Sequence, residues 1–134
     1  MDAADLLRNG LLWMSRSDLV RETIERAPVS RGVVKRFVAG ETPEDAVRVT
    51  GELSDTGRLV TIDFLGEDTT ERAQADATRD AYLTLIARLA DGGHTQGGRA
   101  EVSVKLSACG QSLGDDGDKI ALEHARDLMA RARG

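Results

Sequence analysis

The second half of the chain alternates between short apolar runs and longer amphipathic stretches. Residues 58–65 are rich in branched and aromatic side chains, which is typical of a buried strand. Residues 71–90 repeat apolar positions at helical spacing, with Ala77, Ala81, Leu85 and Leu89 on one face, and predict a long helix. Alternating side chains predict a second strand at 101–106, and helical spacing returns at 119–133. This strand–helix–strand–helix order predicts an α/β fold with a parallel sheet.

The first 57 residues have only helical patterns. Apolar stripes interrupted by glycine and proline predict three short helices before residue 40. The sequence Thr-Pro-Glu-Asp at 42–45 marks a further helix start, because it offers a threonine cap, a proline for the first helical position and two acids for the first turn. That helix is expected to end near Gly57. We therefore divide the chain into a helical N-terminal arm at 1–57 and an α/β part at 58–134.

Length and composition limit the classes of function that remain. The 134 residues suffice for one modest core, and a hydrophobic content of 40% argues against a disordered chain. The formal charge of -5 and the lack of a basic block argue against a nucleic-acid binder, and 3% aromatic residues are too few for a base-stacking platform. A lone cysteine, Cys109, fits a reducing cytoplasmic compartment, and no apolar run is long enough to span a membrane.

Lys105 is the residue that points most directly to chemistry. It lies near the C-terminal end of the second predicted strand, between Val104 and Leu106, where parallel α/β folds place their ligands. An unpaired charge in a buried strand is costly, so one interpretation is an ammonium aimed at a carboxylate or a phosphate. The alternative is a lysine on the solvated face of the sheet, or one whose head reaches water along a buried stem.

Two acids occupy the matching end of the first predicted strand. Asp63 lies in the strand itself, and Glu67 lies in the loop after it. Both are candidates for the same ligand-binding edge, although acids at such positions also form turns or cap helices. Asp68, Thr69 and Thr70 are expected to form a turn or to cap the helix at 71–90.

The remaining motifs do not indicate a site. The acidic loop at 114–118 lacks the spacing and the terminal bidentate acid of a calcium loop, and we interpret it as a turn that leads into a helix. His94 and His124 are distant in sequence, so we expect surface or loop residues and no metal site. Cys109 has no identifiable base, and the paired glycines do not form a dinucleotide- or phosphate-binding fingerprint. The residues alone therefore assign no catalytic group.

Two segments taken together resemble the bacterial monofunctional proline dehydrogenases. Residues 60–68, Val-Thr-Ile-Asp-Phe-Leu-Gly-Glu-Asp, are similar to the first barrel strand of that family. Residues 100–107, Ala-Glu-Val-Ser-Val-Lys-Leu-Ser, with Gly-Gln at 110–111, are similar to the second strand. The helix start at 119–123 and the spacing between the strands are similar too. The resemblance runs through essentially the whole chain and identifies it with the N-terminal portion of the family.

The resemblance implies a fold and an activity. The family folds as a distorted (β/α)8 barrel, binds FAD and oxidises L-proline to Δ1-pyrroline-5-carboxylate, the first step of proline breakdown to glutamate. It implies hydride transfer from the proline ring carbon beside nitrogen to the flavin, and a role for Lys105 in holding the substrate carboxylate. A quinone as the electron acceptor would bring this cytoplasmic protein to the inner face of the membrane.

The chain is short for that fold. A (β/α)8 barrel has eight strands and typically about 250 residues, whereas the pattern here supplies two strands. The expected fold class is therefore α/β, with a helical N-terminal arm followed by the first two βα units of an incomplete barrel. The family's paired arginines of the last barrel helix and most flavin contacts have no counterpart, so we expect a truncated sequence that is inactive alone. The competing interpretation is a small non-enzymatic α/β domain that binds a partner through open strand edges.

Overall fold

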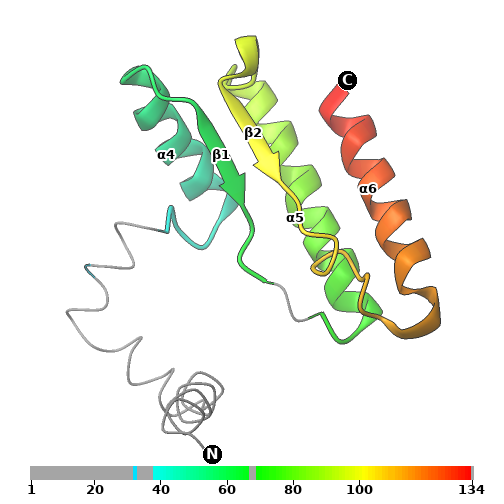
Figure 1. The fold of residues 1–134 in the computed structure, drawn as a ribbon. Helices are drawn as coiled ribbons and strands as arrows, with labels where there is room; N and C mark the ends of the chain where they lie inside the picture. Colours follow the sequence, from blue (N-terminus) through cyan, green and yellow to red (C-terminus); the bar gives the residue numbers. More distant parts are fainter. Residues whose placement is uncertain (1–31, 33–37, 67–68, 134) are drawn as a thin grey trace, which may run out of the picture. The chain divides into compact units, whose positions relative to one another are not determined.

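The structure is a computed structural model that describes residues 32, 38–66 and 69–133. Residues 40–133 fold in the order helix, strand, helix, strand, helix (Figure 1). The three short helices expected before residue 40 fall almost entirely outside the described residues. The elements are α4 (Pro43–Asp55), β1 (Val60–Asp63), α5 (Arg72–Asp91), β2 (Ala100–Ser103) and α6 (Gly117–Arg133), with 3₁₀ turns η1 (Gln96–Gly98) and η2 (Gly114–Asp116).

Helix α4 begins as its sequence predicts and ends with a turn that shortens β1. Thr42 Oγ1 accepts a hydrogen bond from the Asp45 N–H at 3.2 Å, which confirms the predicted cap. At the other end, the Arg58 N–H donates to the Leu53 carbonyl at 3.2 Å. Since this turn uses Arg58, β1 begins at Val60 and not at 58 as predicted. It also ends at Asp63 and not at 65.

The two strands form the parallel pair that the alternation predicts. Val60 lies opposite Ala100, and the register continues to Asp63 opposite Ser103. Helix α5 covers one face of the pair, with α4 and α6 on either side of that helix (Figure 1). Among the described residues the sheet has only these two strands, so they contain two βα units and no closed barrel.

Helix α5 supplies the central strip of the core. One cluster packs α5 against α6, and a second packs it against α4 and the two strands. Ala77, which the periodicity places on the buried face, is exposed, because the buried strip runs through Thr78 and Tyr82 instead. The buried side chains of this helix recur three or four residues apart: Ala75, Thr78, Tyr82, Leu85, Ile86 and Leu89.

Strand β2 ends earlier than its sequence predicts. The alternation predicts a strand to residue 106, but β2 ends at Ser103. The Lys105 carbonyl accepts from the Ala108 N–H at 3.1 Å, and the Leu106 carbonyl accepts from the Cys109 N–H at 3.0 Å. Lys105 therefore lies two residues beyond the strand, at the start of a hydrogen-bonded turn.

Candidate functional site

Asp63 and Lys105 meet at the carboxyl ends of the two strands. Because β1 and β2 are parallel, both carboxyl ends lie at one edge of the sheet. Lys105 Nζ lies 2.9 Å from Asp63 Oδ2, and the two side chains are 40% and 34% exposed. The ammonium thus has a carboxylate partner and remains accessible to solvent. The structure brings together two of the three predicted site residues, and the third, Glu67, lies outside the described residues.

The sheet face that carries this pair is polar. Thr61 and Asp63 of β1 are exposed, as are Glu101 and Ser103 of β2. Thr61 Oγ1–H donates to Glu101 Oε1 at 2.9 Å, which makes a second cross-strand polar contact below the Asp63–Lys105 pair. An apolar layer packed on this face would have to desolvate two carboxylates, which is costly. The face therefore suits water or a polar ligand.

Tyr82 of α5 reaches the same strand ends from the covered side of the sheet. Its side chain is only 2% exposed, yet its Oη accepts from the Phe64 N–H at 3.1 Å and donates to the Ser103 carbonyl at 2.7 Å. Oη also lies 3.5 Å from Asp63 Oδ1. Burial raises the pKa of the Tyr82 hydroxyl above its usual value, so the phenol stays a proton donor. Sequence reasoning placed Tyr82 in the helix and missed this contact, because helical periodicity does not report where a side-chain tip ends.

The turn that carries Lys105 is fastened at two further points. Thr69 Oγ1–H donates to the Ala108 carbonyl at 3.1 Å, and His124 Nδ1 lies 3.0 Å from the Cys109 carbonyl. Of the two roles predicted for Thr69, turn former or helix cap, capping is therefore wrong, since its hydroxyl binds the turn after β2. The N-cap of α5 is Glu71, which makes no side-chain cap hydrogen bond. The backbone after Lys105 is thus held by Thr69, which lies just before α5, and by His124 of α6.

His124 is a buried hydrogen-bonding residue, which corrects the expectation of a surface or loop histidine. It is 0% exposed, and its Nε2 lies 2.9 Å from Asp76 Oδ1 on α5. Asp76 also accepts from Arg72 Nε at 3.0 Å, and Arg72 lies 3.5 Å from Glu123 of α6. The Arg72 hydrogen bond lowers the pKa of the Asp76 carboxyl below its ordinary value, and His124 acts in the same direction. This network joins α5, α6 and the turn after β2.

The other motifs of the second half are structural. The Cys109 thiol is 0% exposed and burial raises its pKa, which is the opposite of an activated nucleophile. The acidic stretch at 114–118 forms η2 and the first turn of α6, as its interpretation as a turn predicts. Within the described ranges, no three acidic, histidine or cysteine side chains are grouped to hold a metal ion. No helix of these ranges is both long and apolar enough to cross a bilayer.

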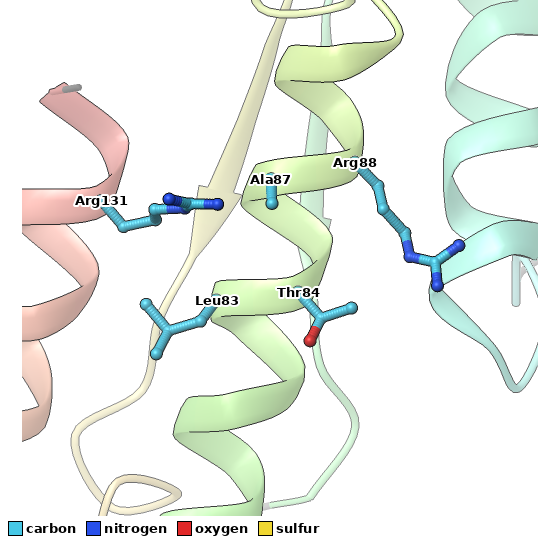
Figure 2. A pocket seen from close by; sticks show the side chains of 5 residues that line it. All are labelled: Leu83, Thr84, Ala87, Arg88 and Arg131. Atoms are coloured by element: carbon cyan, nitrogen blue, oxygen red, sulfur yellow. The ribbon is translucent and has the colours of Figure 1, made fainter.

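An open pocket of ≈ 440 Å³ lies on the outer side of α5 and does not include the strand ends. It is lined by Leu83, Thr84, Ala87 and Arg88 of α5 and by Arg131 of α6. Figure 2 shows Arg131 extending from α6 toward α5, while Arg88 extends from α5 away from α6. Arg88 is paired with Glu44 of α4. The two guanidinium groups therefore do not converge on one ligand, and the pocket gives no argument for a site.

Comparisons with known proteins agree with the resemblance that the strand motifs suggest. The chain is 33% identical over 101 residues to the proline dehydrogenase of Deinococcus radiodurans, a match that covers 75% of this chain and 31% of that protein. It is 30% identical over 128 residues to proline dehydrogenase 1 of Bacillus subtilis, covering 96% of this chain and 40% of that protein. No family model matches the chain. The chain spans less than half the length of these relatives, and it is related to bacterial proline dehydrogenases over that part of them.

Proposed function

We propose that this chain forms the carboxylate-binding edge of a FAD-dependent proline dehydrogenase, which oxidises L-proline to Δ1-pyrroline-5-carboxylate in proline catabolism. One observation carries the proposal: the Lys105 ammonium stands at the shared carboxyl ends of two parallel strands, 2.9 Å from Asp63. Its support is the relationship to proline dehydrogenases over 31% and 40% of their length. In this proposal the arm at 1–57 precedes two βα units at 58–134.

The physical role of Lys105 is to fix the substrate carboxylate. The attraction between an ammonium and a carboxylate is favourable at any protein dielectric. By binding the carboxylate, the ammonium orients the rigid proline ring. Asp63 holds the ammonium in place before the substrate arrives. The incoming carboxylate must offset the free energy that is lost when this ion pair weakens. Half-exposure of Lys105 leaves room for that carboxylate to approach from the uncovered face of the sheet.

The described residues do not by themselves form a site for FAD. A flavin dinucleotide carries a pyrophosphate, which is bound by cations or by clustered backbone N–H groups. The uncovered face of the sheet instead presents two carboxylates, those of Asp63 and Glu101, beside the ammonium of Lys105. We propose that the isolated chain binds FAD weakly or not at all and does not oxidise proline.

The test of carboxylate binding is a titration of the isotope-labelled chain with L-proline, followed by the NMR signals of the Lys105 side chain. We expect these signals to shift with proline and not with prolinol, which keeps the ring and lacks the carboxylate. Proline should also shift the backbone amide signals on either side of residue 105. Lys105→Met is expected to abolish that shift, whereas Lys119→Met, the same change at an exposed position on α6, preserves it. An equal response to proline and prolinol contradicts the assignment.

The test of the isolated chain is a preparation with added FAD, dialysed and assayed for dye reduction with proline. We expect no retained flavin and no dye reduction. A stoichiometric, yellow preparation that reduces the dye contradicts the proposal of inactivity. Reading the gene beyond the codon of Gly134 for further strand–helix units and a late arginine pair tests the proposed role in a longer enzyme.

A second candidate function is partner binding without catalysis, and one observation favours it. Each strand of the described sheet has one unpaired edge, and Leu59 and Leu65 beside β1 are 77% and 72% exposed. Unpaired edges and exposed apolar side chains are features of association surfaces. A selective response of Lys105 to proline favours the enzyme, whereas no response to any carboxylate favours the binding domain.

A further inference from the structure

The hydrogen-bond ladder between β1 and β2 has a fixed repeat that predicts its next rung. Val60 lies opposite Ala100, and its N–H donates to the carbonyl of Arg99, one residue before its partner, at 2.9 Å. In a parallel pair this pattern recurs every two residues. Two further steps bring the Phe64 N–H opposite the Ser103 carbonyl. A regular ladder would join these two groups directly.

The Tyr82 hydroxyl occupies the position of that direct bond. Its Oη accepts from the Phe64 N–H at 3.1 Å and donates to the Ser103 carbonyl at 2.7 Å. The tyrosine thus satisfies both backbone groups that the ladder would have paired, with one oxygen atom between them. Two hydrogen bonds in series span a wider gap than one, so the hydroxyl holds the ends of β1 and β2 apart.

The separated ends are those that carry the charged pair. Asp63 immediately precedes Phe64, and Lys105 follows Ser103 by two residues. Oη also lies 3.5 Å from Asp63 Oδ1, while Asp63 Oδ2 lies 2.9 Å from Lys105 Nζ. A change in the separation of the strand ends therefore moves both charged groups relative to each other.

We propose that Tyr82 is a positioning residue for the Asp63–Lys105 pair, acting as a one-atom spacer that replaces the last rung of the ladder. The inference rests on the proposed function in taking Lys105 as the carboxylate-binding group. Tyr82 does not touch the substrate in this arrangement. The Tyr82 hydroxyl sets the separation of the strand ends that carry Asp63 and Lys105. It therefore determines where the substrate carboxylate meets the Lys105 ammonium.

A purely space-filling role for Tyr82 makes a different prediction. The ring packs in the core cluster with Ile86 and contacts Phe64 with ring centroids 6.0 Å apart and an interplanar angle of 59°. Phenylalanine preserves that ring and removes only the oxygen. If packing were the whole role, Tyr82→Phe would leave the strand ends unchanged, whereas a spacer predicts a local change at Phe64 and Lys105.

The first measurement uses the unmodified chain. Scalar couplings through hydrogen bonds report which carbonyl accepts each amide proton, so NMR tests the Phe64–Ser103 pair directly. We expect no direct coupling between the Phe64 N–H and the Ser103 carbonyl. Because Tyr82 is the chain's only tyrosine, labelling that residue type reports its hydroxyl without ambiguity. A direct coupling in the unmodified chain overturns the proposal, whether or not any variant folds.

The second measurement compares Tyr82→Phe with Ile86→Val, which trims the same core cluster and leaves the hydroxyl in place. If the strand ends stay apart in Tyr82→Phe, we expect hydrogen exchange of the Phe64 amide to accelerate roughly tenfold, the factor for losing one hydrogen bond. If the strand ends move together, we expect a direct coupling between the Phe64 N–H and the Ser103 carbonyl to appear. Either result is accompanied by a shift of the Lys105 side-chain signals. Ile86→Val is expected to leave both readouts at their original values.

Replacement of Tyr82 by fluorotyrosine restores a hydroxyl and is expected to restore the Phe64 and Lys105 signals. Unchanged signals in Tyr82→Phe, or equal changes in Ile86→Val, overturn the spacer. These readouts come from the ligand-free chain, so they are independent of the proline titration. A failed titration with the expected ladder result counts against the carboxylate assignment, and a positive titration with an unchanged ladder counts against Tyr82 as the positioning residue.

Discussion

His124 and Asp76 form a hydrogen bond of 2.9 Å between Nε2 and Oδ1 across the interface of α6 and α5. The imidazole is fully buried, and its Nδ1 lies 3.0 Å from the Cys109 carbonyl. Both ring nitrogens thus face oxygen atoms, and the histidine joins two helices to the turn that follows Lys105. Its contribution is therefore to the placement of that turn as well as to the core.

Replacement of His124 by leucine tests this contribution. The change keeps a buried side chain of similar size but removes both ring nitrogens. The Cys109 carbonyl then loses its contact with His124. We expect the free energy of unfolding to fall by about 1–3 kcal/mol, the cost of an unsatisfied buried polar group. Urea unfolding followed by circular dichroism measures it. Leu122→Ala on the exposed side of α6 is the control, and equal effects of the two variants would contradict a specific role.

Asp76 gives the chain a defined sensitivity to acid. The Arg72 hydrogen bond lowers the pKa of this carboxyl in the folded state, so the carboxylate contributes stability above its unfolded pKa of about 4. That contribution is lost as pH falls through the lower, folded pKa. We expect Asp76→Asn to be less stable than the unmodified chain at neutral pH and to lose less stability on acidification. Urea unfolding at a series of pH values measures both, with Asp91→Asn, an exposed site at the end of α5, as the control.

Tyr82 gives the opposite sensitivity at high pH. Burial raises the pKa of its hydroxyl in the folded chain above the unfolded value of about 10. The neutral phenol therefore contributes stability that is fully present below the unfolded pKa and lost as pH rises through the folded one. Tyrosinate absorbance reports this single tyrosine directly. We expect the pKa of Tyr82 in the folded chain to lie above its pKa in urea. Equal pKa values in the two states would contradict a buried phenol.

Two glycines near the start of α6 are required for different reasons. Gly117 has an ordinary helical φ of -57°, but an added Cβ would lie 2.2 Å from the Gln111 carbonyl oxygen. Gly114 has open space around it and a φ of +56°. We expect Gly114→Ala to cost about 1–2 kcal/mol from backbone conformation, and Gly117→Ala to cost more, because the helix start must move away from the backbone of the turn. Thermal unfolding of the two variants gives the order, and a smaller loss for Gly117→Ala would contradict the close approach.

Local patterns in the sequence predict most of the helices and the pairing. The cap of α4 depends on Thr42 and Asp45, which are three residues apart, and the parallel pairing follows from the alternation of strands and helices. The strand-end rule also selects Asp63 and Lys105 before any distance is known, because carboxyl ends of parallel strands converge. These features need only short-range geometry or one topological rule.

The sequence by itself determined the order of elements, the parallel sheet and two of the residues at its carboxyl edge. Only the tertiary structure decided that Tyr82 inserts a hydroxyl into the ladder and that His124 is buried between α5, α6 and the turn after β2. The physical reason is that a side-chain hydrogen bond requires a particular donor and acceptor within about 3 Å, and helical periodicity carries no information about which distant backbone group lies there. For the same reason the strands end earlier than their composition predicts: side-chain and turn hydrogen bonds take the backbone groups that another rung would have used.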